Sequence, residues 1–499
     1  MKRIIVLMGI IAVFLAASAQ EEMEYGTGLV ADNEAYDKIP KKPILLTRDY
    51  SSLPESFSLK KYCPKAGSQG QFGTCTAWSS TYAARTIAEA IKWGWTNQKI
   101  INQEAFAPLF VYAKIKNKAD SICRDGIRMD LALELLKKKG APKLKNFNVK
   151  CADFIPRWVA DEAADYTIDD YFTIFSYQCK SASEKINRTK KALSQERPVI
   201  INMYFPRSFY RARDVWEGGT YDGSTMLYHA MCVVAYDDHK EGGAFQIMNS
   251  WDETWGNKGF TWVKYRDFAK YVDWAFEIYV KKVRYPEVIT KNDTVSVKKE
   301  DLISHNQKTD YIKNIDNAEK ETINKLSGKM NIELATGENM EHHLVNGKWP
   351  VYKTVGAYIS GTRYRVNLLN NEPAYVYVIG SDLNNNVSKV FPQNDNISPA
   401  LVYSSNSIAL PDEKWYIEMD NTIGKDYLCV LYAGHELPIN DIIRKIKQGA
   451  GSFTDKLTKA LGQNGLAPQS DIYYAEDKIS FVATTKGSVV PIIVEITHN

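Results

Sequence analysis

Residues 68–80 read Ser-Gln-Gly-Gln-Phe-Gly-Thr-Cys-Thr-Ala-Trp-Ser-Ser, a glycine-rich loop that runs into a stretch with helical spacing. In residues 75–92, apolar side chains recur at intervals of seven, four and three positions, which places them on one face of a helix. They are Ala77, Ala84, Ala88 and Ile91. Cys75 falls in the first turn, where Thr74 is placed to cap the helix. The helix dipole favours a thiolate there. The stretch therefore predicts a nucleophilic cysteine, and the alternative is a small buried cysteine in an amphipathic helix.

A cysteine nucleophile needs a site for the oxyanion and a base. Gln69 lies six residues before Cys75, and its amide together with the Cys75 backbone N–H would form an oxyanion pocket. Residues 52–285 contain two histidines, of which His239 lies in a polar stretch that indicates an exposed turn. His229 opens the apolar run that ends at Tyr236, so a rigid strand would hold its ring. His229 is therefore the expected base, and the alternative is a core histidine whose hydrogen bonds are satisfied.

An asparagine follows His229 at a distance of twenty residues, in the sequence Asn249-Ser-Trp251. An amide oxygen is suited to accept the Nδ1–H of a protonated imidazole, which fixes its tautomer and its ring angle. Trp251 would shield that hydrogen bond from water. The pattern predicts a chain of interactions from Cys75 through His229 to Asn249.

The chain has seven cysteines, so at least one thiol is free. Cys232 and Cys429 stand in apolar runs and are expected to be buried strand thiols. With Cys75 kept free as the nucleophile, four cysteines are plausible bridge partners and allow three pairings. These are Cys63, Cys123, Cys151 and Cys179.

Three blocks of sequence together resemble the papain-like cysteine peptidases, the C1 family. They read Gln-Gly-x-x-Gly-Thr-Cys-x-Ala-Trp-Ser, His-Ala-Met-x-Val-x-Ala-Tyr, and Asn-Ser-Trp-x-x-x-Trp-Gly-x-x-Gly-Phe. The resemblance covers about residues 52–284 and implies that Cys75 is the nucleophile and His229 the acid and base. It likewise implies that Asn249 orients the histidine and Gln69 supplies the oxyanion hole. The implied fold is α+β and two-lobed, with a helical lobe around the cysteine helix and a β-barrel-like lobe that carries the histidine.

The resemblance also carries expectations about bridges and control. It implies a disulfide between Cys123 and Cys151. The family usually has a cysteine where Phe72 stands, so that bridge is not expected. Zymogens of the family carry a long helical inhibitory segment, whereas the polar residues 20–51 show no helical repeat. We therefore expect this strap to pack along the lobes as structure, without latency of that kind.

Composition shifts divide the rest of the chain. The family-like domain spans residues 52–285, a polar linker spans 286–325, and a β-rich domain of unknown function spans 326–499. Short β-rich runs between Asn, Asp and Gly turns predict a separate β-sandwich-like fold, with a helical insertion near 439–461. This domain resembles a bacterial domain found beside peptidases, and we expect that it docks an unknown protein partner. The adjacent His342 and His343 do not predict a metal site, and no cofactor is expected.

The N-terminus has the three parts of a secretory signal: basic Lys2 and Arg3, the apolar run 4–15, and the small residues 17–19. The run is shorter than the ~20 residues that span a bilayer, which argues against the alternative of a membrane anchor. Cleavage after residue 19 would give an exported bacterial protein, periplasmic or secreted, and no later stretch predicts a membrane span. The formal charge of +4 gives no reason to expect a nucleic-acid partner.

The sequence as a whole predicts an enzyme that hydrolyses peptide bonds of a peptide or protein substrate through a thioester acyl-enzyme. Two other interpretations remain. One is a catalytically silent binding protein that kept the papain fold, although none of its four catalytic residue types is lost. The other is a transpeptidase or amidase that resolves the same acyl-enzyme with an amine.

Overall fold

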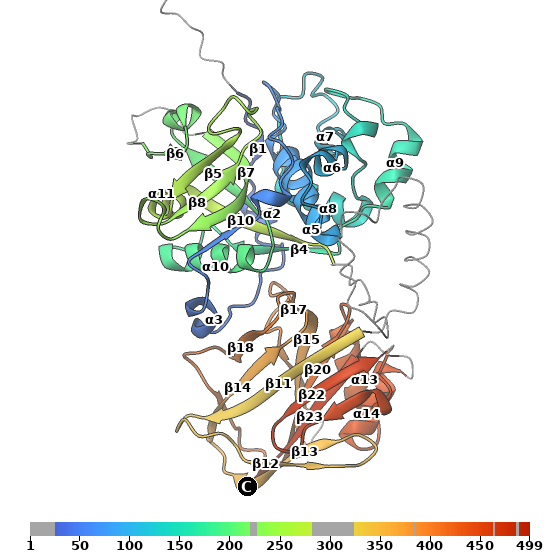
Figure 1. Ribbon diagram of the computed structural model, residues 1–499. Helices are drawn as coiled ribbons and strands as arrows, with labels where there is room; N and C mark the ends of the chain where they lie inside the picture. Colours follow the sequence, from blue (N-terminus) through green and yellow to red (C-terminus); the bar gives the residue numbers. More distant parts are fainter. Residues whose placement is uncertain (1–24, 220–226, 282–323, 383–385, 463–464, 486–488) are drawn as a thin grey trace, which may run out of the picture.

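The computed structural model describes residues 25–219, 227–281, 324–382, 386–462, 465–485 and 489–499 (Figure 1). Within these ranges the chain forms two units, one on either side of the gap at residues 282–323. The expected signal peptide, 1–19, lies outside the described residues, as does the linker except for its last two positions. Strand β11 begins at Asn324, so the second unit begins two residues earlier than the sequence predicts.

The cysteine helix of the first unit spans Cys75–Trp93 without a break. It begins as α4 (Cys75–Ala77), continues in π-helical turns (Trp78–Arg85) and ends as α5 (Thr86–Trp93). Gly94 closes it in the left-handed region, at φ 65°, a conformation that glycine adopts without strain. The predicted helix is therefore confirmed, but the predicted cap is wrong. Thr74 occupies the N-cap position without a side-chain capping bond, because its φ of −112° and ψ of 11° differ from the usual extended cap conformation.

Further helices lie on the same side of the first unit as the cysteine helix (Figure 1). They are α6 (Gln98–Gln103), α7 (Pro108–Ile115), α8 (Met129–Lys139) and α9 (Arg157–Ala164). Helix α8 ends at Gly140 as expected, and begins two residues late because β3 (Ile127–Arg128) precedes it. A disulfide joins Cys123 to Cys151, as the resemblance implied. Cys63 and Cys179 remain free thiols, which corrects their place among the bridge partners.

The main sheet of the first unit is mixed and has the strand order β4-β10-β5-β7-β8-β9-β6, and a separate two-stranded sheet pairs β1 (Leu29–Val30) with β3. Their bounds are Asp170–Phe175 (β4), Val272–Tyr279 (β10), Val199–Phe205 (β5), Leu227–Asp237 (β7), Ala244–Met248 (β8), Phe260–Lys264 (β9) and Val215–Trp216 (β6). A further strand, β2 (Ser56–Ser58), pairs with β7. Among the described strands no pairing joins β6 to β4, so the sheet is open, and the β-barrel-like lobe expected from the resemblance is not a closed barrel. Helices α10 (Ala182–Ser194) and α11 (Tyr265–Tyr271) pack against this sheet.

The second unit consists of two sheets that share one apolar core, as the sandwich-like prediction requires. One sheet has the order β18-β14-β11-β22-β21, and the other β12-β13-β23-β20-β15-β16. Tyr432 of β20 (Gly424–Ala433) meets Phe481 of β22 (Ser480–Thr485) between the sheets, with ring centroids 4.9 Å apart. The remaining bounds are β11 (Asn324–Leu334), β12 (His342–Val345), β13 (Val351–Tyr358), β14 (Arg363–Asn370), β15 (Ala374–Ser381), β16 (Val387–Phe391), β17 (Ala400–Leu401), β18 (Asn406–Leu410), β19 (Ile417–Glu418), β21 (Ile472–Tyr474) and β23 (Val489–His498). The predicted helical insertion is two helices, α13 (Ile439–Gln448) and α14 (Phe453–Leu461), packed on the outer face of the second sheet.

The described part of the strap, from residue 25 onward, touches both units. It contains β1 (Leu29–Val30), α2 (Asn33–Tyr36) and α3 (Thr47–Ser51), the last of which lies between the units in Figure 1. Lys41 forms parallel bridges to Thr173 of the first unit and to Ile397 of the second. The backbone N–H of Leu46 donates to the Ser407 carbonyl, and the side chain of Thr47 donates to Glu413. One short segment is thus hydrogen-bonded to both units.

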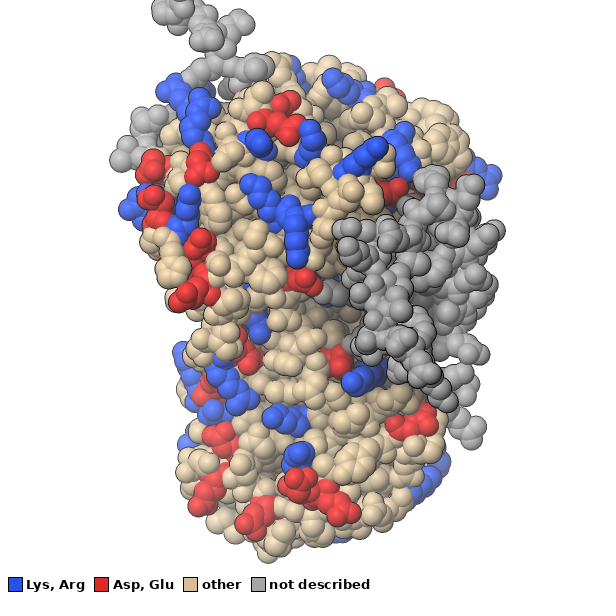
Figure 2. Space-filling model, in the orientation of Figure 1, with Lys and Arg blue, Asp and Glu red and all other residues tan. Residues whose placement is uncertain are grey.

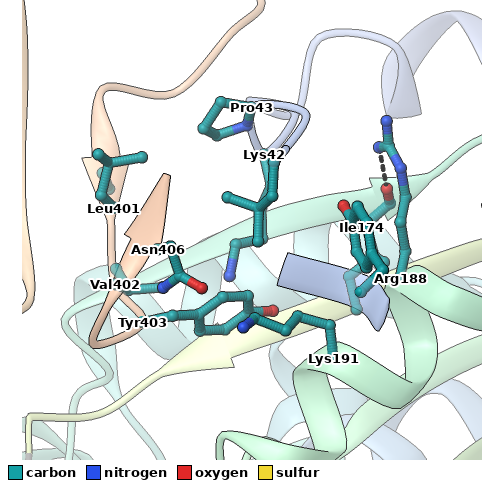
Figure 3. Close-up of a pocket in the computed structure, with 12 residues that line it drawn as sticks. Lys42, Pro43, Ile174, Arg188, Lys191, Leu401, Val402, Tyr403 and Asn406 are labelled. Carbon is teal, nitrogen blue, oxygen red and sulfur yellow. Dashed lines mark hydrogen bonds between the residues drawn. The ribbon is translucent and has the colours of Figure 1, made fainter. Parts of the chain in front are cut away.

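Lys42 and Tyr403 lie close together at this junction (Figure 3), where Lys42 forms a buried ion pair with Glu277. Lys42 Nζ donates to Glu277 Oε1 at 2.8 Å, and its ammonium lies 3.1 Å from the ring centroid of Tyr403. The Tyr403 hydroxyl donates to the other oxygen of Glu277, whose side chain has no exposed surface. Burial lowers the pKa of Lys42 to about 7, although the carboxylate opposes the shift. The strap, the first unit and the second unit each supply one member of this cluster.

We predict that Lys42→Met destabilises the folded chain, because Glu277 would keep its buried charge and lose its cation. Removing one partner of a buried pair costs about 3–5 kcal/mol. The measurement is urea unfolding at pH 6, where Lys42 is protonated. Lys38→Met is the matched control, since Lys38 pairs with Glu34 at the surface, and it should leave the midpoint unchanged. Equal midpoints for the two variants would contradict the prediction.

Candidate functional site

Cys75 lies at the start of the cysteine helix and is completely buried. Helix α4 packs against β7, and the Thr76 hydroxyl donates to the Ile127 carbonyl, which fixes the first turn. The sulfur accepts a hydrogen bond from the backbone N–H of Gly28 at 3.1 Å. The backbone of Ala230, the residue after His229, also interacts with the thiol. The structure therefore brings the predicted nucleophile to the strand that carries the predicted base.

His229 stands near the beginning of β7 and is also completely buried. Its Nε2 lies 2.7 Å from Asn249 Oδ1, so the predicted contact forms through a different nitrogen. The predicted contact through Nδ1 is therefore wrong. Strand β8 pairs with β7, and Asn249 is the first residue after β8, so its side chain reaches the ring at Nε2. The Nδ1 atom is buried and has no hydrogen-bond partner among the described residues. It is therefore the nitrogen left to exchange a proton.

Trp251 covers the His229–Asn249 pair, as predicted. Its ring stacks on the imidazole with centroids 4.6 Å apart and planes 25° apart, and no part of Trp251 is exposed. Phe205 meets the imidazole edge-on from β5, at 6.1 Å. The aromatic rings exclude water from the Nε2 hydrogen bond and hold the plane of the histidine.

Gln69 reaches the same site from the loop before the helix. Its Nε2 donates to the Gly26 carbonyl at 2.9 Å and to the Phe72 carbonyl at 2.8 Å. Its Oε1 accepts a hydrogen bond from the Ser250 hydroxyl at 2.5 Å. That bond fixes the orientation of the Gln69 side-chain amide, so its NH2 group points toward the carbonyls of Gly26 and Phe72. Gln69 is thus placed as a donor to a carbonyl oxygen, which is the chemistry expected of it.

Sequence reasoning missed Ser250. Its hydroxyl orients Gln69, and its backbone N–H donates to Asn249 Oδ1 at 2.8 Å. Its carbonyl also accepts from the Gln69 backbone N–H. One serine therefore connects the Gln69 amide with the Asn249 amide that holds the histidine. The sequence signal that could have indicated this role is the position of Ser250 directly after Asn249.

The strap begins on this site, which corrects the expectation that it serves only as packing along the lobes. Residues 25–30 run between Cys75 and the loop of Gln69. Strand β1 pairs in parallel with β3, and the Gly28 carbonyl accepts from the Ile127 N–H at 3.1 Å. The ring of Tyr25 stacks on Trp251, with centroids 5.1 Å apart. The N–H of Gly28, rather than a carbonyl carbon, meets the sulfur, so the strap occupies the site without presenting a bond to attack.

The strap can approach so closely because it has no side chain at two positions. A Cβ on Gly26 would lie 2.3 Å from the Phe72 carbonyl oxygen, and a Cβ on Gly28 would lie 2.0 Å from the Gly73 backbone. Both distances are shorter than any tolerated contact, and the obstacles are backbone atoms. The sequence Gly26-Thr-Gly28 is therefore required for the strap to enter the site.

Burial shifts the pKa of both Cys75 and His229 toward the neutral form of each group. Desolvation raises the pKa of the Cys75 thiol to about 11, although hydrogen bonds from Ala230 and Gly28 oppose it. Desolvation lowers the pKa of His229 to about 4, against the effect of the Asn249 hydrogen bond. Burial therefore favours the neutral thiol and the neutral imidazole over the thiolate–imidazolium pair near neutral pH.

Within the described ranges, no group of three or more His, Cys, Asp or Glu side chains is placed to hold a metal ion. His342 and His343 are neighbours on β12 and so point to opposite faces of its sheet. A search of the same described ranges finds no helix with the length and apolar character that crossing a bilayer requires.

Residues 53–273 match the family described as "Papain family cysteine protease". Cysteine proteinase RD21A of Arabidopsis thaliana is 26% identical over 213 residues, which are 42% of this chain and 42% of that protein. Cysteine protease XCP2 of Arabidopsis thaliana is 24% identical over 256 residues, 50% of this chain and 66% of that protein. The structure of Xylellain, a cysteine protease from Xylella fastidiosa, is 20% identical, with a TM-score of 0.41 over 53% of this chain and 97% of that one. The alignments thus span under half of the first relative, and the second unit lies outside the family match.

We predict that alkylation of Cys75 by iodoacetamide is slow at neutral pH in the intact chain and accelerates with pH. The thiolate is the reacting form, so a pKa of about 11 leaves ~10⁻⁴ of the thiol reactive at pH 7, and the rate should rise about tenfold per pH unit up to that value. A chain without residues 25–31 should react at pH 7 near its maximal rate. Mass spectrometry of the Cys75 peptide measures this, with Cys75→Ala as the blank for the partly exposed Cys179. A fast, pH-independent reaction of the intact chain would refute it.

Proposed function

We propose that the first unit, whose residues 53–273 carry a papain-family cysteine protease domain, hydrolyses peptide bonds with Cys75 as nucleophile. One observation carries the proposal. The site already holds a peptide backbone, with the carbonyl of Gly26 on the Gln69 amide and the N–H of Gly28 on the Cys75 sulfur. A site that binds main-chain groups beside a cysteine and a histidine is suited to peptides.

The reaction starts when the Cys75 proton moves to Nδ1 of His229 and the thiolate attacks the carbonyl carbon. The oxyanion that forms accepts hydrogen bonds from Gln69 Nε2 and from the Cys75 backbone N–H. The imidazolium keeps its Nε2–H on Asn249 and returns the Nδ1 proton to the leaving amine, which yields a thioester. His229 then takes a proton from water, the hydroxide attacks the thioester carbonyl carbon, and the C–S bond breaks to release the acid while the imidazolium returns its proton to the sulfur.

In this form of the chain the reaction cannot proceed. The strap occupies the place of the substrate at the Cys75 sulfur, and the burial of Cys75 and His229 favours the neutral form of both groups. When the strap leaves, water and the mutual attraction of thiolate and imidazolium favour the charged pair. We therefore propose that the described form is latent.

We further propose that the chain is exported from a bacterial cell, to the periplasm or beyond, after loss of residues 1–19. The basic, apolar and small-residue order of that segment supports the proposal, and the Cys123–Cys151 disulfide is compatible with an oxidising compartment. N-terminal sequencing of the exported chain tests this proposal, and the chain is expected to begin at Gln20. On the face shown in Figure 2, basic and acidic side chains are interspersed over both units, so charge on this face selects no strongly acidic or basic substrate.

The proposal predicts that Cys75→Ala abolishes peptide hydrolysis in a chain freed of residues 25–31. An epoxide inhibitor of thiol peptidases should label Cys75 in the freed chain and leave the variant unlabelled. A peptide library read by mass spectrometry, with and without an added amine, separates hydrolysis from transpeptidation. Labelling without any turnover would favour the silent binding protein.

Ser250→Ala should lower kcat about tenfold with little change in KM, because it frees the amide of Gln69 to rotate. Loss of an oxyanion donor itself costs about 10²–10³ in kcat, and a misplaced donor costs less. Steady-state kinetics of the freed chain measure the split, and Ser79→Ala is a control with a buried hydroxyl bonded within the cysteine helix. A raised KM with unchanged kcat would place Ser250 in substrate binding instead.

A further inference from the structure

A hollow lies at the junction of the strap with the two units, and its lining side chains come from all three parts (Figure 3). It measures about 410 Å³ with its open mouth included. The lining includes Lys42 and Pro43 of the strap, Arg188 and Lys191 of α10, and Val402 and Asn406 of the second unit. We call this hollow the junction pocket. We propose that it binds the carboxyl-terminal end of a short peptide whose last residue is apolar.

Positive charge is in excess around the junction pocket. Burial lowers the pKa of Lys42 to about 7, and repulsion by the nearby Arg197 and Lys191 adds to this shift, against the attraction of Glu277. Arg197 and Lys191 are themselves buried, with exposed fractions of 6% and 7%. Three cations therefore lie near one buried carboxylate, which already pairs with Lys42 at 2.8 Å.

Lys191 is the cation of the lining with the weakest partner. Its ammonium donates to the Asp49 carbonyl at 3.5 Å, while the Asp49 carboxylate accepts from the backbone N–H of Ser407 at 2.6 Å. Arg188, by contrast, pairs with Glu184 at 2.8 Å. Buried charges in proteins are normally paired. Lys191 is therefore placed to receive an anion that the described residues do not supply.

Asn406 adds an acceptor without a donor. The residue is 1% exposed, and its Nδ2 donates to the Ser404 carbonyl at 3.3 Å. Its Oδ1 is buried and has no hydrogen-bond partner among the described residues, and in Figure 3 this oxygen points into the hollow. A buried acceptor left without a donor is destabilising. A ligand in the junction pocket is thus expected to bring an N–H or O–H group to Asn406.

The rest of the wall is largely apolar and includes Pro43, Leu45 and Val402. A ligand that matches this lining carries a negative charge, a hydrogen-bond donor and an apolar body. The last residue of a peptide has all three, because its carboxylate can pair with Lys191 while its backbone N–H donates to Asn406 Oδ1. A free amino acid also carries an ammonium group, which the surrounding cations repel. The chemistry therefore favours the end of a peptide over a single amino acid.

Such a ligand would be coupled to the arrangement of the whole chain. Because the lining comes from the strap and from both units, the pocket is complete only while these three parts are together. Binding therefore stabilises the junction by mass action. Peptide hydrolysis, the proposed function, would supply carboxyl ends of this kind, although the pocket binds them whether or not Cys75 is active.

The test measures binding to the full-length Cys75→Ala chain by isothermal titration calorimetry, with N-acetyl-leucine as the probe. Three analogues each lack one group: N-acetyl-leucinamide the carboxylate, 4-methylpentanoate the N–H donor, and N-acetylglycine the apolar side chain. N-acetyl-leucine should bind roughly tenfold more tightly than N-acetyl-leucinamide, because the amide cannot pair with Lys191, and more tightly than the other two analogues. No measurable binding of N-acetyl-leucine, or equal binding of its amide, would overturn the proposal.

Variants of Lys191 assign the probe to this pocket. Lys191→Met keeps the apolar stem and should weaken the binding of N-acetyl-leucine about tenfold, whereas Lys191→Arg should restore most of it. Lys180→Met is the matched control, because the Lys180 ammonium also donates to a backbone carbonyl, that of Tyr177 at 2.8 Å, and this variant should bind the probe normally. Unchanged binding by folded Lys191→Met would refute the assignment. If that variant does not fold, the analogue series on the chain with Lys191 decides.

Hydrogen exchange measured by mass spectrometry locates the bound probe. N-acetyl-leucine should slow exchange in peptides that cover residues 42–50 and 400–406. Slower exchange confined to the Gln69 loop and the start of the cysteine helix would place the probe in the catalytic site, which contradicts this inference. None of these measurements uses peptide turnover, so the two proposals fail separately. A chain that binds the probe at the junction but hydrolyses no peptide contradicts the proposed function only, and a peptidase that leaves the junction pocket empty contradicts this inference only.

Discussion

The close approach of the Gly28 amide to the Cys75 sulfur is the contact on which the described state depends. At 3.1 Å it leaves no room for a substrate carbonyl, and it requires glycine at two positions of the strap. It also covers the thiol, and burial favours the neutral form of that group. One contact therefore both closes the site and contributes to the burial of the nucleophile.

The site behind that contact is held by a small set of hydrogen bonds between neighbouring elements. Asn249 and Ser250 follow β8, which pairs with the histidine strand β7. Their side chains fix His229 from one side and Gln69 from the other. The alignment of base and oxyanion donor is thus set by one strand end, and Trp251, the next residue, seals it. The bonds that Asn249 and Ser250 make include no strap residue, whereas the strap adds the Gly26 carbonyl as an acceptor for Gln69 and Trp251.

The sequence predicted these elements where side-chain pattern determines structure. The spacing of Ala77, Ala84 and Ala88 gave the cysteine helix, and the apolar run after His229 gave β7. It did not predict contacts that depend on how neighbouring strands are placed. The choice of Nε2 over Nδ1 follows from the side on which β8 lies, and the role of Ser250 from its distance to a loop 181 residues away. The position of Gly26 and Gly28 was also hidden, because two glycines carry no periodic signal and bind only through their backbone.

The strap, which closes the site, also holds the two units together, so the second unit is connected to the first through the same segment. Thr173 and Ile397 bind the backbone of Lys41 from opposite sides, so the strap acts as a shared strand between two domains. The strap keeps this position only while both units contact it. If the strap were wholly removed, the interface would lose its main-chain bonds together with the cation of Glu277. The segment at Cys75 and the segment between the units are also connected to each other, because the buried Tyr36 hydroxyl donates to the Val30 carbonyl at 2.6 Å.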